Sequence, residues 1–190
     1  MAPAPRASTG HSRPTAAELA AAADRTIPDV AAAGLRVLLC GINPGLYSAA
    51  VGHHFARPGN RFWPALHASG WTARVLRPDE QWQLLGLGLG ITNVAARATA
   101  RADELAPEEL REGARLLAAK VRALRPGWLA VLGVTAYRTA FGRKHAVVGP
   151  QDETIGSTRL WVLPNPSGLN AHWTAPALAA EFARLRSVAG

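Results

Sequence analysis

Four short apolar runs recur along the chain, and each is bounded by Gly, Pro or polar residues. They cover residues 35–40, 90–94, 128–132 and 159–163. Runs of this length are typical of buried strands in a parallel sheet, where both faces of the sheet are covered. The first run ends at Cys40 and passes directly into a loop that contains Pro44 and Gly45. We therefore expect four strands at the centre of the fold.

Helical patterns lie between and after these runs. Apolar residues of segment 60–69 recur near helical spacing, and Gly70 stands where a C-terminal cap belongs. Segment 107–124 carries acids in its first turn and bases toward its end, as the helix dipole favours. Two shorter helices are predicted over 135–141 and 175–188. The alternation predicts an α/β fold with three layers, α/β/α, around a short, mainly parallel, four-stranded sheet.

The first 26 residues differ in composition from the rest. They are rich in Ala, Pro, Ser, Thr and Arg and lack an aromatic side chain, so they bury too little surface to offset their ordering entropy. We expect a flexible tail over 1–26 and a single domain over 27–190. Within the tail, residues 15–24 favour a short helix capped by Thr15. A solvated leader is the simpler interpretation of this segment, and an organelle transit peptide is the alternative.

The charge balance is basic. The 190 residues contain 21 Lys and Arg against 13 Asp and Glu, which gives a net charge of +8. Such a balance favours a polyanionic partner, although many basic proteins bind nothing specific. Charge therefore indicates a class of partner and leaves the reaction open.

Several classes of protein are excluded by composition. No run approaches the roughly 18 apolar residues of a membrane helix, and no secretory signal is present, so we expect a cytoplasmic, monomeric protein of the bacterial cytosol or nucleoid. The single cysteine, Cys40, excludes an internal disulfide and a four-thiolate cluster. His53 and His54 are adjacent and have no acidic partner nearby in sequence, so no metal site is predicted.

Two loops combine Asn, Pro and Gly directly after predicted strands. One reads Gly-Ile-Asn-Pro-Gly-Leu over 41–46, and the other reads Leu-Pro-Asn-Pro-Ser-Gly-Leu-Asn over 163–170. Pro fixes a turn, Gly lets backbone amides approach a ligand, and Asn offers both a donor and an acceptor. Either loop alone is typical of an ordinary Asn-Pro turn. Because strand carboxyl ends meet at one sheet edge, the two loops together predict a shared pocket.

These motifs resemble those of the mismatch-specific uracil-DNA glycosylases, which include the thymine-DNA glycosylases. The likeness rests on the motif at 41–46, the region around Phe55, Asn-Arg-Phe-Trp at 60–63 and Asn-Pro-Ser-Gly-Leu at 165–169, in the family's order. It implies a uracil-DNA glycosylase-like fold and a hydrolase of base excision repair without a cofactor. Such an enzyme flips uracil, typically opposite guanine in double-stranded DNA, and hydrolyses its N-glycosidic bond.

The resemblance also implies roles for single residues. Asn43 would hold the attacking water. Phe55 would stack on the flipped base, with backbone groups of Ile42 and Gly45 near the base carbonyls, and Asn165 would form the second wall. Since an amide is a poor general base, the reaction would depend on stabilising the departing uracil anion and the oxocarbenium-like sugar.

A wedge is implied for the second motif. Gly168 and Leu169 would fill the space that the flipped base leaves in the duplex. After them, Asn170 and Ala171 stand where mismatch-specific relatives often carry Ser-Arg, and Asn170 is expected to contact DNA with the wedge. The resemblance therefore leaves the reading of the widowed guanine to backbone groups of the wedge.

Other candidates come from their position in the chain. Asn93 ends the second strand at the pocket edge, where its amide would bind a base edge or a water in a catalytic role. The alternative is a strand-terminal Asn that satisfies its own turn. Ser48, in the first loop, offers a hydroxyl to the substrate.

Contacts to DNA phosphates are expected around the start of segment 60–69. Arg57, Arg61 and His54 flank this helix start, where backbone amides attract anions. The hydroxyl of Ser167 suits the same purpose.

Two further expectations concern the class of protein. The competing interpretation is a noncatalytic nucleic-acid- or nucleotide-binding α/β domain, but the chain has no Gly-rich phosphate-binding motif and does have the paired Asn loops. Only Lys120 and Lys144 could supply a side-chain amine, and we expect Lys120 on a helix face far from the strand ends. A monofunctional glycosylase is therefore predicted, because a lyase step needs an amine nucleophile.

Overall fold

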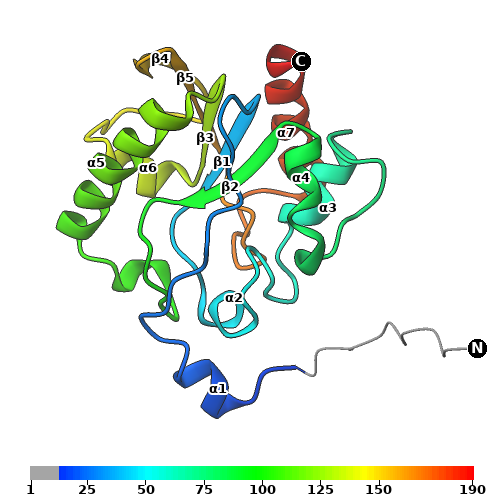
Figure 1. The fold of residues 1–190 in the computed structure, drawn as a ribbon, viewed down its shortest axis with the longest axis vertical. Coiled ribbons are helices and arrows are strands. Elements are labelled where there is room, and N and C mark those ends of the chain that lie inside the picture. Colours follow the sequence, from blue (N-terminus) through cyan, green and yellow to red (C-terminus); the bar gives the residue numbers. More distant parts are fainter. Residues whose placement is uncertain (1–12) are drawn as a thin grey trace, which may run out of the picture.

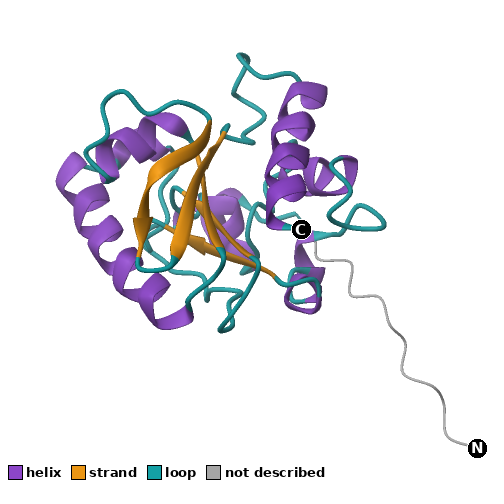
Figure 2. Ribbon diagram, turned by 90° about the horizontal axis from the view of Figure 1, so that it is seen from above, coloured by secondary structure: helices purple, strands orange, loops and turns teal. Residues whose placement is uncertain are grey.

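A five-stranded sheet forms the centre of the computed structural model, which describes residues 13–190. Figures 1 and 2 show the sheet from two sides. Its order is β2-β1-β3-β5-β4. The strands are β1 Val37–Gly41, β2 Leu89–Asn93, β3 Trp128–Leu132, β4 Gly149–Ile155 and β5 Thr158–Leu163. β2, β1, β3 and β5 pair in parallel and correspond to the four predicted runs. The α/β class and the mainly parallel sheet are confirmed.

The fifth strand, β4, corrects the predicted count of four. It pairs antiparallel with β5 at the edge of the sheet, with a register shift between Gln151 and Thr154. Its sequence, Gly-Pro-Gln-Asp-Glu-Thr-Ile, contains residues that are depleted in strands, and only its first and last residues are buried. An edge strand is held by one neighbour and faces solvent, so it needs no apolar run.

Helices cover both faces of the sheet (Figure 2). One face packs on α3 Phe62–Ala68, α4 Gln83–Gly86 and α7 Ala175–Ala189. The other packs on α5 Pro107–Leu124 and α6 Val134–Ala140. Successive residues of β1 therefore enter different cores: Leu39 joins the first and Leu38 the second, and both are essentially fully buried. The three layers agree with the predicted architecture.

Two short helices lie at the end of the sheet where the loops gather (Figure 1). They are α1 Ala16–Ala20 and α2 Leu46–Val51. Thr15 caps α1 as predicted, in a reciprocal arrangement with Glu18. Ala22 is fully buried and packs in a small apolar cluster with Ala49 of α2. The helix predicted within the tail is thus confirmed. Residues 1–12 of the predicted tail lie outside the described residues, and its flexibility stays a prediction.

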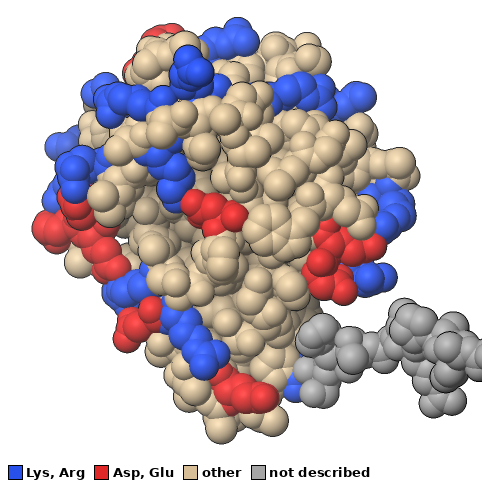
Figure 3. Space-filling model, viewed as in Figure 1, with Lys and Arg blue, Asp and Glu red and all other residues tan. Residues whose placement is uncertain are grey.

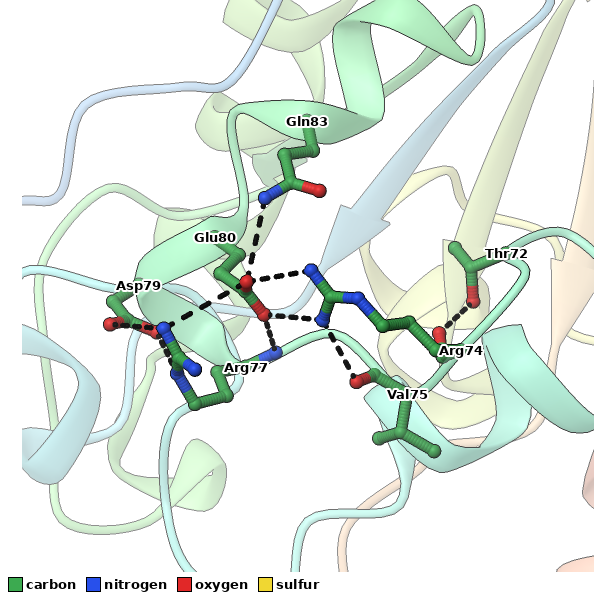
Figure 4. Close-up of polar contacts among 7 residues, drawn as sticks. All are labelled: Thr72, Arg74, Val75, Arg77, Asp79, Glu80 and Gln83. Carbon is green, nitrogen blue, oxygen red and sulfur yellow. Dashed lines mark hydrogen bonds and ion pairs between the residues drawn. The ribbon is translucent and has the colours of Figure 1, made fainter.

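Charged side chains in the connection between α3 and α4 bond to one another (Figure 4). Glu80, in the 3-10 turn Pro78–Glu80, accepts hydrogen bonds from both terminal nitrogens of Arg74, at 2.7 and 2.8 Å. It also accepts from the backbone N–H of Arg77 at 2.8 Å. These donors, Arg74 first, lower the pKa of Glu80 to about 2. This carboxylate therefore helps to order a connection that also buries Trp71 and Leu76 in the core.

No helix in residues 13–190 is long and apolar enough to cross a membrane.

Candidate active site

A cavity of about 160 Å³ opens at the carboxyl ends of the parallel strands. Asn43 lines it from the loop after β1, Asn93 from the end of β2, and Asn165 from the loop after β5. The chain separates these three amides by 50 residues or more, and the sheet brings them together. The expectation that these loops share one pocket is confirmed.

The side chain of Asn43 is held in one orientation. Its Nδ2 donates to the carbonyl of Arg97 at 3.0 Å and to the hydroxyl oxygen of Thr99 at 2.7 Å. The Thr99 hydroxyl donates its own proton to the carbonyl of Arg101, 2.7 Å away, so it meets Asn43 as an acceptor. Both partners accept, and a flipped amide would place its own oxygen against these two acceptors. The donor side of Asn43 is therefore occupied, and no hydrogen bond among residues 13–190 uses its Oδ1, which remains an acceptor for a ligand.

Asn165 is held in the opposite sense. Its Oδ1 accepts a hydrogen bond from the backbone N–H of Ser167 at 2.9 Å, as in an Asx turn. No hydrogen bond within residues 13–190 uses its Nδ2. The two Asn-Pro loops thus offer complementary groups to one cavity, an acceptor from Asn43 and a donor from Asn165.

Asn93 is oriented by a buried histidine. The Nε2 of His54 lies 3.0 Å from the carbonyl oxygen of Pro28, which can only accept, so Nε2 carries the proton. Burial is the main cause that lowers the pKa of His54 and keeps the ring neutral. Its Nδ1 then accepts from Nδ2 of Asn93 at 3.4 Å. His54 is 2% exposed and therefore supports Asn93; it does not reach the surface as the expected phosphate contact would.

Phe55 forms an aromatic wall. Its ring stacks on Phe62 of α3, with centroids 4.0 Å apart and planes 19° apart. A Cβ on Gly41 would lie 3.2 Å from Cζ of Phe55 and 2.5 Å from Oδ1 of Asn93. The strand therefore ends in glycine because two cavity side chains lie directly over its Cα. Phe55 itself adopts a left-handed backbone conformation, with φ of 53°.

The other expected pocket residues also line the cavity. Ile42, Gly45 and Ser48 are among them. A Cβ on Gly45 would meet nothing within 4 Å, so this position leaves open space. The Ser48 hydroxyl is buried and accepts a hydrogen bond from the backbone N–H of Ala56 at 3.0 Å. Ser48 thereby ties α2 to the segment that carries Phe55.

The expected DNA contacts fall into two groups. Arg57 is exposed at the cavity rim, and Leu169 is 76% exposed in an irregular loop, both accessible to a duplex. Ser167 lines the cavity, and Gly168 lies so close to the carbonyl of Gly59 that a Cβ would be 2.5 Å from its oxygen. Asn170 is turned inward.

Arg61 and Asn170 differ from their expected roles. The guanidinium of Arg61 donates to the carbonyls of Ser167, Asn170 and Trp173. Nδ2 of Asn170 donates to the carbonyl of Asn165 at 3.0 Å. A phosphate contact by Arg61 does not agree with this arrangement, because its donors already face the protein's own oxygens.

The basic surface is interrupted by acids. Figure 3 shows Lys and Arg spread around one face, many beside an acidic group. On and near α5, four arginines that could have formed a DNA-binding stripe are each in an ion pair: Arg97, Arg101, Arg111 and Arg115. Net charge alone therefore does not mark the DNA-binding face.

Three contributors were not found from the sequence. Thr99 lies in an Ala/Arg-rich loop without a motif, and only its contact with Asn43 reveals it. His54 was expected as a phosphate contact, and its support of Asn93 was not found from the sequence. Lys120 was expected far from the strand ends, which is wrong: its ammonium pairs with Asp29 and donates to the Thr92 hydroxyl at 3.0 Å, one residue before Asn93.

The described residues contain no group of three or more His, Cys, Asp or Glu placed to hold a metal ion.

Comparison with known proteins identifies the family of this chain. A family model described as the uracil DNA glycosylase superfamily matches residues 28–186. The fold is similar to the solution NMR structure of a candidate uracil DNA glycosylase from Methanosarcina acetivorans, with a TM-score of 0.58 at 18% sequence identity. That likeness covers 86% of this chain and 98% of the other and shows a shared fold. Because the family model spans most of the chain and all three cavity amides, the protein belongs to the uracil-DNA glycosylase superfamily.

Proposed function

We propose that the protein is a monofunctional, mismatch-specific glycosylase that flips uracil from G:U mispairs and hydrolyses its N-glycosidic bond. The observation that carries this proposal is the complementary pair of amides in one cavity, Asn43 with a free acceptor and Asn165 with a free donor. The product is an abasic site, which enters base excision repair.

Asn43 has the role of holding the attacking water. Its Oδ1 accepts a hydrogen bond from the water and so aims the water oxygen at the sugar carbon. An amide does not remove a proton well, so the water attacks a sugar whose bond to the base is already largely broken. The rate therefore depends on how well the departing uracil anion is stabilised.

Asn165 and the loop backbone supply that stabilisation. Nδ2 of Asn165 donates to a carbonyl of the base, where negative charge develops as the bond breaks. Donors fixed before the reaction are effective because they need no reorganisation at that moment. Asn93, fixed by His54, lies beside them at the cavity wall.

The base reaches this cavity by leaving the duplex. Phe55 offers one ring face to uracil while its other face stays on Phe62. Leu169 fills the space that the flipped base leaves in the DNA duplex. An apolar side chain with this role is expected to be exposed on the free protein, as Leu169 is. Together these contacts offset the few kcal/mol of lost stacking and pairing.

Single-turnover uracil release tests the proposal. Duplexes with U opposite G, with U opposite A, and the single strand are incubated with the protein, and alkali then cleaves any abasic site. We expect cleavage in all three, fastest for the G:U duplex. Binding to the duplex without alkali-sensitive sites would instead identify a noncatalytic nucleic-acid-binding domain, and equal rates on G:U and A:U would contradict the mismatch preference.

A further inference from the structure

Arg61 precedes α3 and lies against the loop that carries Leu169. Two of its side-chain hydrogen bonds go to the carbonyls of Ser167 at 2.8 Å and Asn170 at 2.9 Å, and a third goes to the carbonyl of Trp173. Its backbone N–H donates to the carbonyl of Pro166 at 3.0 Å. One residue thus binds four carbonyls spread over residues 166–173, which we name the wedge loop.

Only arginine fits these contacts. The acceptors are all carbonyl oxygens, and they are reached in different directions by one planar group with five N–H donors. The Nε of Arg61 is buried and has no hydrogen-bond partner in residues 13–190. The side chain thus makes its three other hydrogen bonds although one of its N–H donors stays unpaired. A lysine would bring one compact ammonium and could not span the same oxygens.

The wedge loop has little else to hold its shape. It contains no helix or strand, and its internal bonds are local, such as Asn170 N–H to the carbonyl of Ser167 at 3.0 Å. Gly168 rests on the carbonyl of Gly59. Leu169, between these points, is 76% exposed.

We propose that Arg61 is a positioning residue that fixes the wedge loop before DNA binds, so that Leu169 enters the duplex without a further loss of loop entropy. A loop ordered in advance does not pay its ordering entropy during association. The expected effect on uracil release rests on the proposed function. In this role Arg61 binds the wedge loop and does not contact a DNA phosphate. It also links the Asn-Arg-Phe-Trp motif to the Asn-Pro-Ser-Gly-Leu motif.

Arg61→Lys tests the inference, with Arg115→Lys on the exposed face of α5 as the matched control. Single-turnover uracil release is measured on G:U duplex and on single-stranded DNA. We expect the duplex rate of Arg61→Lys to fall about tenfold or more and the single-strand rate to fall clearly less, because both substrates use Asn165, which Ser167 orients, and only the duplex also needs the wedge. In a Leu169→Ala background the same change should have little further effect on the duplex rate.

Two outcomes would overturn the inference. An equal fall on both substrates would indicate a general structural role for Arg61, and no fall on either would show that the loop does not depend on it. If Arg61→Lys folds poorly, Gly168→Ala perturbs the same loop from the Gly59 side and should show the same duplex-selective loss; an equal loss on both substrates would again count against the wedge.

Amide hydrogen exchange separates this inference from the proposed function. Exchange over the wedge loop should be faster in Arg61→Lys than in the parent, with the sheet unchanged, and unchanged exchange in the loop would refute the positioning role. If the parent protein releases no uracil, the proposed function fails, and the exchange measurement still decides whether Arg61 orders the loop.

Discussion

At the scale of single residues, the site depends on neighbours that determine which face of each amide is free. Asn43 and Asn165 are the same residue type, yet one presents an acceptor and the other a donor. The difference comes from Thr99 and Arg97 in one case and from Ser167 in the other. The motifs identify both asparagines from the sequence, but the partners of Asn43 are more than 50 residues away and carry no motif of their own.

Thr99 provides the first prediction. Thr99→Val removes the acceptor for Nδ2 of Asn43 while keeping the side-chain shape, so the amide is no longer fixed. Uracil release should fall about tenfold, since one N–H of this partly buried amide loses its acceptor and only the bond to the Arg97 carbonyl remains. Thr99→Ser keeps the hydroxyl and is the control. Equal rates for the Val and Ser variants would show that Asn43 does not depend on this bond.

Gly41 provides the second. In Gly41→Ala the new Cβ would overlap Oδ1 of Asn93 and press on the ring of Phe55, so both must shift. We expect single-turnover release to fall about tenfold or more, because small displacements at a reacting site have large effects. Gly86→Ala, whose Cβ meets nothing within 4 Å, should release uracil at the parent rate. Full activity of Gly41→Ala would contradict the close packing of this wall.

At the scale of elements, the buried strands and the long helix could be predicted from the sequence, and the exposed or short elements could not. The four central strands and α5 were predicted because buried apolar runs and a long amphipathic pattern leave a clear record in the sequence. β4 has no such record, since an edge strand needs only one partner. The short helices α2 and α4 were also missed, because six and four residues are too few to establish a helical period.

The segment around Glu80 gives an element-scale prediction. Its pKa is lowered to about 2 in the folded protein from an ordinary 4.5. The carboxylate therefore stabilises the fold fully above about pH 4.5, and this contribution is lost as the pH falls toward 2. In urea unfolding, Glu80→Gln should lower the free energy of unfolding near neutral pH.

The difference between Glu80→Gln and the parent should then shrink between pH 4.5 and 2. Asp79→Asn, an exposed neighbour in the same turn, is the control and should change the curve little. A Glu80→Gln difference that stays constant over this pH range would refute the assigned pKa.

At the scale of the whole molecule, the position of the candidate active site follows from the carboxyl edge of the sheet and not from the net charge. The excess of basic residues in the sequence suggested a polyanionic partner. On the surface, however, many of the arginines within residues 13–190 form ion pairs with acidic residues (Figure 3). The convergence of β1, β2 and β5 at one edge is what gathers the three amides, and the order of elements allowed it to be predicted.

The absence of a lyase step is a prediction at this scale, since it concerns both lysine side chains of the protein. Neither Lys120 nor Lys144 lines the amide cavity, and the Lys120 ammonium is paired with Asp29. Borohydride added during turnover should trap no covalent protein–DNA adduct. An adduct in good yield that disappears in Lys120→Arg would show that an amine attacks the sugar, and hydrolysis by water would then be wrong.

The central claim is that a water held by Asn43 breaks the bond between uracil and its sugar, and Asn43→Ala tests it most directly. Single-turnover release from a G:U duplex is measured beside duplex binding by gel shift. We predict that release falls about a hundredfold or more, because positioning of the water is lost, while duplex affinity stays near that of the parent. Release at the parent rate, or loss of release only in step with loss of binding, would contradict the account.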